Sequence, residues 1–217
     1  SAVAAMSAWG TSIAVTSFPS LDNDADQLYL RTLNGRIMHA VNYETEWYQN
    51  ELKKEGGWSL EMTDTRLPCA GMINWKASTS VTGGSPGKKN ANDAPLTDLQ
   101  GPRLKRSYTT DSVTVILVYD EPVDSLSAAV PGNYSADAGI TILSAICLPP
   151  LFQQVQIKTS TELLRDKIYT ITASNIKDCK GNSIGNYNQV RTGIPAEPVP
   201  GEWIINEILF NPKSNAY

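Results

Sequence analysis

Three acidic residues repeat at every second position in LDNDADQL, and such a pattern could bind a cation. Asp22, Asp24 and Asp26 have the spacing of the first three ligands of an EF-hand calcium loop. That loop also requires glycine at its sixth position and glutamate at its twelfth, where this chain has Gln27 and Leu33. The sequence excludes an EF-hand and leaves two interpretations, a looser surface calcium site or a solvated turn in which Asp and Asn bond their own backbone.

A second acidic group lies in the middle of the chain. Asp120, Glu121 and Asp124 flank Pro122 after an expected strand, and Asp178 lies in a similar turn. A calcium site at a domain junction could be assembled from these residues if the fold brings their loops together. Solvated loop charge is the alternative, and no other cofactor is expected.

Residues for acid–base or nucleophilic catalysis are scarce. His39, in IMHAVNY, is the only histidine in the sequence, and no Gly-x-Ser-x-Gly elbow accompanies it. Glu44 and Glu46 could be a carboxylate pair, but nothing around them in the sequence suggests a cleft. We therefore expect no enzymatic activity.

Composition limits the classes of partner. The 217 residues are 41% hydrophobic, enough for a core in one or two domains. The net charge of -4 and the pI near 5.1 provide no basic field, so nucleic acid is not an expected partner. No stretch has the roughly 18 to 20 apolar residues that cross a bilayer, and the first residues lack the positive region of a signal peptide. Because the sequence could begin within a longer protein, export is not excluded.

Three cysteines, at 69, 147 and 179, allow one bridge and leave one thiol. Cys147 ends an apolar run and Cys179 lies in the turn-like NIKDCKGN, so both could lie at one end of the same sandwich. A Cys147–Cys179 disulfide is one prediction, and two thiols without a bridge are the alternative.

The hydrophobic pattern predicts an all-β chain, because apolar residues alternate over short spans separated by Gly, Pro, Asn and Asp. In LNGRI, Asn34 and Gly35 predict a two-residue hairpin turn with positive φ at both positions. Short helical turns are expected within 45–54 and 125–130. The expected strands are 12–16, 27–33, 37–43, 58–62, 112–120, 140–146, 154–159, 168–173 and 202–210.

Two composition shifts predict the boundaries of modules. A polar stretch, KKNANDAPLTDLQ, and the proline-rich GIPAEPVPG separate three regions, and four of the five tryptophans precede the first boundary. The expected organisation is a first module (1–92), a linker (93–101), a second module (102–193), a proline-rich linker (194–201) and a terminal strand (202–217).

Several segments of the first module, in order, resemble a bacterial lamin tail domain. FPSLDNDADQLYLRTLNGRI, GGWSLEM, PCAGMINWKAS and GGSPGKKN resemble the C-terminal two-thirds of that domain, over residues 11–90. The strand that opens such a domain is absent there and is found as IINEILFNP, within 202–212. The resemblance implies an incomplete Ig-like β-sandwich followed by the first strand of a second copy, in a tandem repeat.

The second module resembles the bacterial Ig-like modules of surface-layer proteins. SVTVILVYDEPVD, PGNYS and YTITASNIKDCKGNSI correspond to their opening strand, their asparagine–tyrosine corner and their closing strand. Both resemblances imply two Ig-like β-sandwich modules in tandem, the first incomplete, in an extracytoplasmic protein that is secreted or on the cell surface.

Two kinds of function are compatible with this organisation. The first is a structural or adhesive array whose modules act as spacers and dock a protein or a cell-surface polymer. The second is an accessory glycan- or polymer-binding module of a larger extracellular enzyme, with Trp47, Tyr48 and Tyr43 as its contact residues. Glycan binding predicts two exposed coplanar rings, and the spacer predicts packed rings.

The terminal strand suggests self-association. A sheet without its first strand has a free edge, and the strand 202–212 has the type of sequence that this edge lacks. It could fold back or exchange between chains as a domain swap, with Ile204, Ile205, Ile208 and Phe210 as contact residues.

Overall fold

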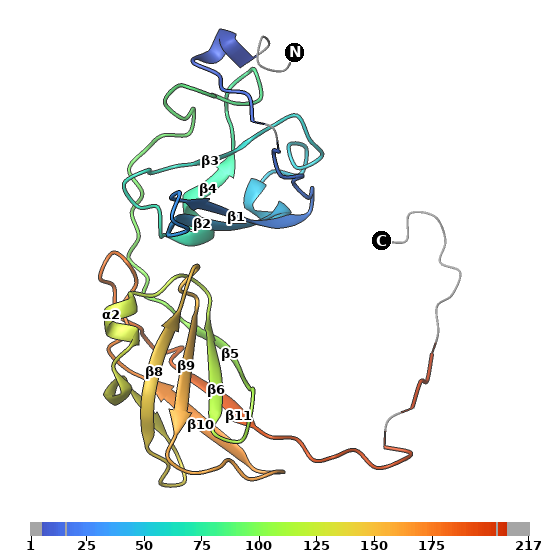
Figure 1. Ribbon diagram of the computed structural model, residues 1–217, viewed down its shortest axis with the longest axis vertical. Coiled ribbons are helices and arrows are strands. Elements are labelled where there is room, and N and C mark those ends of the chain that lie inside the picture. Colours follow the sequence, from blue (N-terminus) through green and yellow to red (C-terminus); the bar gives the residue numbers. More distant parts are fainter. Residues whose placement is uncertain (1–5, 16, 203, 208–217) are drawn as a thin grey trace.

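The chain folds into two β-rich parts joined by an extended linker (Figure 1). The computed structural model describes residues 6–15, 17–202 and 204–207. We call residues 6–92 the N-terminal part and residues 102–193 the sandwich. The expected all-β fold is confirmed, because the regular structure is almost entirely antiparallel strand. No helix in the described residues is long and apolar enough to cross a membrane.

The sandwich consists of two antiparallel sheets. The first has the strand order β5-β6-β9-β8 and the second β11-β10-β7. Short helices α2 (Ser125–Ala128) and η4 (Pro131–Asn133) connect the first sheet to the second. The strands are β5 (Leu104–Thr109), β6 (Thr114–Tyr119), β7 (Tyr134–Ala136), β8 (Ile142–Leu148), β9 (Gln154–Thr159), β10 (Ile168–Ala173) and β11 (Gln189–Gly193).

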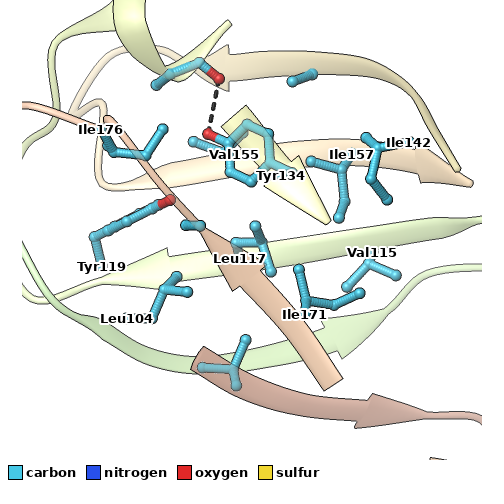
Figure 2. Packing of buried hydrophobic residues seen from close by; sticks show 14 of the residues in the cluster. Leu104, Val115, Leu117, Tyr119, Tyr134, Ile142, Val155, Ile157, Ile171 and Ile176 are labelled. Carbon is cyan, nitrogen blue, oxygen red and sulfur yellow. Dashed lines mark hydrogen bonds between the residues drawn. The ribbon is translucent and has the colours of Figure 1, made fainter. Parts of the chain in front are cut away.

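One hydrophobic core lies between the two sheets (Figure 2). Val115 and Leu117 of β6 face it together with Ile157 of β9, and Ile171 of β10 meets them from the opposite sheet; all four are fully buried. Alternate residues of a strand point to the same face, so the period-two pattern of the sequence produces this core directly. The Tyr134 hydroxyl donates to the Ala128 carbonyl at 2.8 Å and thereby ties β7 to α2.

The N-terminal part consists of two separate two-stranded sheets, β1-β2 and β3-β4. Its elements are η1 (Ser7–Trp9), β1 (Ala25–Arg31), β2 (Ile37–Glu44), η2 (Thr45–Tyr48), β3 (Leu60–Met62), η3 (Gly71–Asn74) and β4 (Trp75–Ala77). A polar centre stabilises it: the fully buried Asn74 accepts from the Asp64 amide at 2.7 Å and donates to the carbonyls of Asp64 and Leu67 at 2.9 and 2.7 Å. The described residues of this part include no apolar cluster like that of the sandwich.

The β1-β2 hairpin is present, but its turn differs from the prediction. Only Gly35 has positive φ (85°), whereas Asn34 does not. The Gly35 amide donates to the Thr32 carbonyl and the Thr32 amide donates to the Arg36 carbonyl, so the connection is a three-residue loop. Such a loop is a turn followed by one left-handed residue, and glycine is needed only at that residue.

The predicted strands agree with the structure best in the sandwich. The bounds of β9 and β10 are as predicted, and β2, β6 and β8 differ by up to two residues at an end. The pattern missed β4 and β7, which have three residues each, β5, whose outer face is polar, and β11. Residues 12–15 form no strand, and Thr16 and much of the predicted strand 202–210 lie outside the described residues.

Candidate functional site: the disulfide-linked junction

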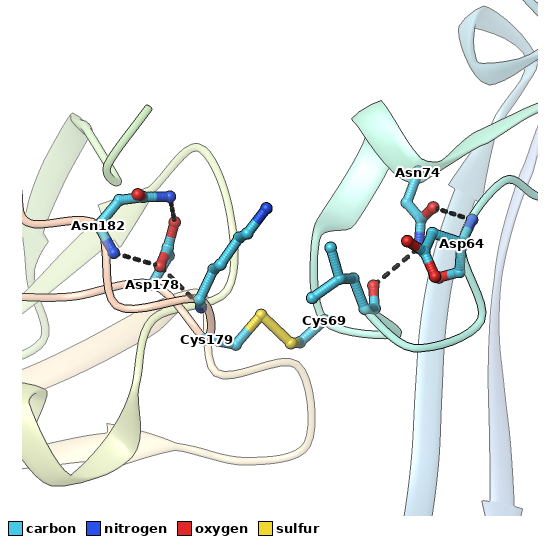
Figure 3. The surroundings of a disulfide bond; sticks show 8 residues. Asp64, Cys69, Asn74, Asp178, Cys179 and Asn182 are labelled. Carbon is cyan, nitrogen blue, oxygen red and sulfur yellow. Dashed lines mark hydrogen bonds between the residues drawn. A yellow bond between two sulfur atoms is a disulfide. The ribbon is translucent and has the colours of Figure 1, made fainter. Parts of the chain in front are cut away.

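A disulfide between Cys69 and Cys179 joins the two parts (Figure 3). Cys69 lies in the loop before η3, and Cys179 lies in the turn after β10, 110 residues later. Their Cα atoms are 6.2 Å apart. The prediction of a Cys147–Cys179 bridge is therefore wrong, and the sequence signal for the correct partner was only the cysteine itself in PCAGM.

Cys147 is unsuited to that bridge because it lies inside the sandwich. It belongs to β8, is buried among the core residues and has a free thiol. Its Sγ contacts the Phe152 carbonyl at 3.9 Å. Burial raises the pKa of this thiol to about 11, since the thiolate would be poorly solvated. Cys179, in contrast, lies in a turn that points away from the sandwich core.

The turn that carries Cys179 is held by the buried Asp178. Its Oδ1 accepts from the amides of Lys180 and Asn182, each at 2.8 Å, and its Oδ2 accepts from the Asn182 side-chain amide at 2.7 Å (Figure 3). An aspartate that bonds the backbone two and four residues later fixes a turn. The D-x-x-G-N sequence therefore orients Cys179 toward the N-terminal part.

The loop that carries Cys69 is held in a similar way. Asp64 is buried, and its two carboxylate oxygens accept from Arg66 Nε and Nη2 at 2.8 Å each. These hydrogen bonds hold the pKa of Asp64 well below its usual range. The Asn74 side chain binds the Leu67 carbonyl two residues before Cys69. Both cysteines are thus presented by loops that side-chain hydrogen bonds constrain.

The linker is bound to both parts. The Leu96 amide donates to Asp64 Oδ2 at 3.1 Å, while the Leu96 carbonyl accepts from Lys180 Nζ at 3.4 Å. The Asn182 side chain also donates to the Asp98 carbonyl at 3.3 Å. A Cβ on Gly101 would lie 2.0 Å from the Ser183 carbonyl oxygen, so the linker passes this turn too closely for any other residue. The expected linker 93–101 is therefore not a free tether.

Three carboxylates gather at the same junction. Oxygen atoms of Asp98, Glu121 and Asp178 lie within 4.8 Å of one another, and both aspartates are buried. First burial and then the neighbouring carboxylates of Asp98, Asp120 and Asp178 raise the pKa of Glu121 to about 8, so this group holds a proton at neutral pH. Such oxygen ligands suit Ca²⁺.

The junction thus brings together only part of the predicted acidic group. Glu121 and Asp178 meet, as the sequence suggested, but the third member is Asp98 from the linker. Asp120 instead accepts from the Arg103 amide at 2.8 Å, and Asp124 caps α2 by accepting from the Ser127 amide at 2.8 Å. Asp98 was missed because its position depends on the path of the linker. A calcium ion here stays a prediction.

The alternating aspartates do not form such a group among the described residues. Asp22 and Asp24 precede β1 and Asp26 lies within it. Asp26 Oδ1 accepts from the next amide at 2.7 Å, and the Asp24 carbonyl accepts from the Thr45 amide at 2.9 Å. The first bond is local to the chain, and the second extends the pairing of β1 with β2 by one residue.

The three aromatic residues proposed as a glycan platform lie around η2. Trp47 is buried against Trp75, with ring centroids 6.1 Å apart and planes inclined at 38°. The Tyr48 hydroxyl donates to the Trp58 carbonyl at 2.9 Å, and the Tyr43 hydroxyl donates to the Asp22 carbonyl at 2.6 Å. Trp47 therefore contributes to packing, as the spacer interpretation expects.

The remaining predicted residues are His39 and the four contact residues of the terminal strand. His39 faces a cavity of about 540 Å³ beside the junction, and its buried Nε2 has no hydrogen-bond partner among the described residues. Ile204 and Ile205 are 75% and 83% exposed. Ile208 and Phe210 lie outside the described residues.

Comparisons with solved structures found likenesses to S-layer proteins at low sequence identity. No family model and no curated protein matches the chain. The crystal structure of the S-layer protein rSbsC(31-844) is 21% identical with a TM-score of 0.40, and the match covers 45% of this chain and 14% of that one. The N-terminal part of the bacterial S-layer protein SbsC is 20% identical with the same TM-score, and the match covers 43% and 23%. The chain thus spans under a quarter of the length of either protein. At this identity and TM-score, the likenesses carry no argument about the role of this chain.

Proposed function

We propose that this chain is a non-catalytic structural module of an extracytoplasmic protein, in which it holds two β-rich parts in a fixed relative orientation as a spacer or docking piece. The Cys69–Cys179 disulfide carries the proposal. A covalent bond between two parts that already share a linker removes most of their relative freedom. Parts joined only by a linker and a small polar interface move relative to each other by default.

The hydrogen bonds at the junction support the same function. Lys180 and Asn182 bind linker carbonyls from the sandwich, and Asp64 binds the linker from the N-terminal part. Each bond contributes about 1 kcal/mol, so these contacts alone would open often. Together with the disulfide they define one arrangement, as a spacer or docking piece requires.

The disulfide also supports an extracytoplasmic location. Disulfides persist in secreted and cell-surface proteins and are rare in the reducing cytosol. The bond joins two loops that are 110 residues apart in the sequence and connects the two parts of the chain. Such a place suits a structural disulfide. The location on a cell surface or in a secreted protein follows as part of the proposal.

The accessory glycan- or polymer-binding module remains the alternative. It requires exposed aromatic faces, whereas Trp47 is buried against Trp75 and the hydroxyls of Tyr43 and Tyr48 are engaged. This packing favours the spacer. A protein or surface polymer bound by loops at the ends of the parts is compatible with the docking role.

A distance measurement across the junction tests the proposal. Spin labels would be attached to cysteines introduced at the exposed strand residues Leu30 (β1) and Leu143 (β8), in a Cys147→Ala background. We expect a narrow distance distribution by pulsed electron resonance. The matched control carries Cys69→Ser and Cys179→Ser as well and should give a much broader distribution. An equally broad distribution with the disulfide intact would overturn the rigid-spacer function.

A further inference from the structure

The N-terminal part has an apolar sheet face that its own described residues cover only in part, because the side chains on it are half-buried. Ile37, His39, Val41 and Tyr43 alternate along β2 and therefore share one face, and Leu28 of β1 lies opposite Val41 on that face. Two hollows of about 540 and 740 Å³ open on this face, and both are lined by Val41 and Trp75. The sheet is therefore separated from β4 by unfilled space.

The same sheet also has free edges. β1 pairs only with β2 among the described residues, so the outer edge of each strand has backbone groups without a sheet partner. An isolated two-stranded ribbon is marginally stable in water, and an open edge is a template for another strand. An apolar face, a hollow and a free edge at one place suit an added β-strand.

The chain itself contains a segment with suitable chemistry and length. WIINEILF, at 203–210, has eight residues, as β2 does, and is apolar at six of them. The described residues of this segment, 204–207, have no sheet partner, and the side chains of Ile204 and Ile205 are exposed to solvent. Burial of these isoleucine side chains in an apolar hollow would remove their apolar surface from water, which is favourable in free energy.

The topology directs this segment away from its own N-terminal part. β10 runs toward the junction and β11 runs back, so the chain leaves the sandwich at the far end (Figure 1). There Arg165 donates to the Pro195 carbonyl at 3.4 Å and pairs with Glu197 at 3.1 Å. The seven steps along the chain from Glu197 to Ile204 span about 22 Å at about 3.1 Å each. That distance is about the length of one sandwich strand and leaves the segment short of the N-terminal part beyond the junction.

We propose that residues 203–210 of one copy add as a β-strand to the β1-β2 sheet of a second copy and fill its hollow. The contact is head-to-tail, and the two surfaces differ, so each copy can both donate and accept a strand. Heterologous contacts of this kind produce open linear arrays when the rotation does not close a ring. The rigid junction would then set the spacing of such an array. Residues 203–210, the tail, could pair with the β1-β2 sheet whether or not the junction is rigid.

The test is the concentration dependence of mass for residues 1–217, by sedimentation or light scattering between about 1 μM and about 1 mM. We expect the average mass to rise above the 23.6 kDa of the monomer and past the dimer. The variant Ile204→Asp/Ile205→Asp should associate at least about tenfold more weakly. Its matched control, Leu126→Asp/Leu164→Asp, changes two exposed leucines of the sandwich and should associate like the unaltered chain.

A mixing experiment identifies the surface that accepts the tail. The fluorescently labelled Ile204→Asp/Ile205→Asp variant still has an intact β1-β2 sheet, so it should enter assemblies of the unaltered chain and shorten them. Exclusion of the variant would mean that tails pair with tails and would overturn the proposal. A constant monomer mass over the whole range would overturn it too, as would amide protection of β1 by the tail within a monomer.

Discussion

Removal of the Cys69–Cys179 bond is expected to destabilise the chain by an amount that its loop length sets. The bond closes a loop of about 110 residues. Loss of loop-closure entropy in the unfolded chain corresponds to about 5 kcal/mol at 25 °C for this length. Measured effects of disulfides are commonly 2–4 kcal/mol. We therefore expect Cys69→Ser to lower the free energy of unfolding by about 3 kcal/mol.

The set of variants makes this prediction specific. Cys69→Ser, Cys179→Ser and the double variant should all lose the same amount, because any one of them removes the whole bond. Cys147→Ala should lower the free energy of unfolding by about 1 kcal/mol through lost core packing. Because this variant still has the Cys69–Cys179 bond, a reductant should still destabilise it. Reductant should destabilise the unaltered chain and Cys147→Ala, and should leave the Cys69 and Cys179 variants unchanged.

The tryptophans allow the two parts to be followed separately. Trp9, Trp47, Trp58 and Trp75 lie in the N-terminal part, and the sandwich has none. Four of the five tryptophans thus report on the N-terminal part; with the fifth replaced (Trp203→Phe), fluorescence during urea unfolding follows that part alone, while far-UV circular dichroism reports on both. Additive losses for Cys69→Ser and Cys179→Ser, or a reductant effect that requires Cys147, would refute the reasoning and restore the pairing expected from the sequence.

Three further predictions concern the junction and the N-terminal part. Gly101→Ala should destabilise the chain by about 2 kcal/mol in urea unfolding, because its Cβ would overlap the Ser183 carbonyl; no change would show that the linker can move aside. Asn74→Ala should lower the fluorescence-detected stability by about 3 kcal/mol, since buried backbone partners lose their bonds, whereas Asn23→Ala, at an exposed position, should have little effect. The raised pKa of Glu121 favours its protonated form in the folded state, so this stabilisation is complete below pH 4.5 and is lost as the pH rises through about 8. Glu121→Gln should match the unaltered chain at low pH and exceed its stability by about 2 kcal/mol above pH 8, a value reduced from a ceiling of about 5 because the side chain is only partly buried; parallel pH profiles would contradict this.

Local sequence patterns determined the elements that depend on near neighbours. Alternation along β9 and β10 fixed both strands and their buried faces, because side-chain direction in a strand follows from position alone. Gly35 fixed the position of the first hairpin, although the type of its turn depended on the pairing of Thr32 with Arg36. Short strands such as β7 have too few residues for a period to appear.

Only the tertiary structure decided the contacts between distant loops. Three cysteines permit three pairings, and the choice of Cys69 with Cys179 depends on how the linker places the N-terminal part beside the turn of Asp178. The same placement brings Asp98 to Glu121, and the folding of the N-terminal part itself buries Trp47 against Trp75. Sequence separation carries no information about such distances, because loops are positioned by the packing of the elements that they join.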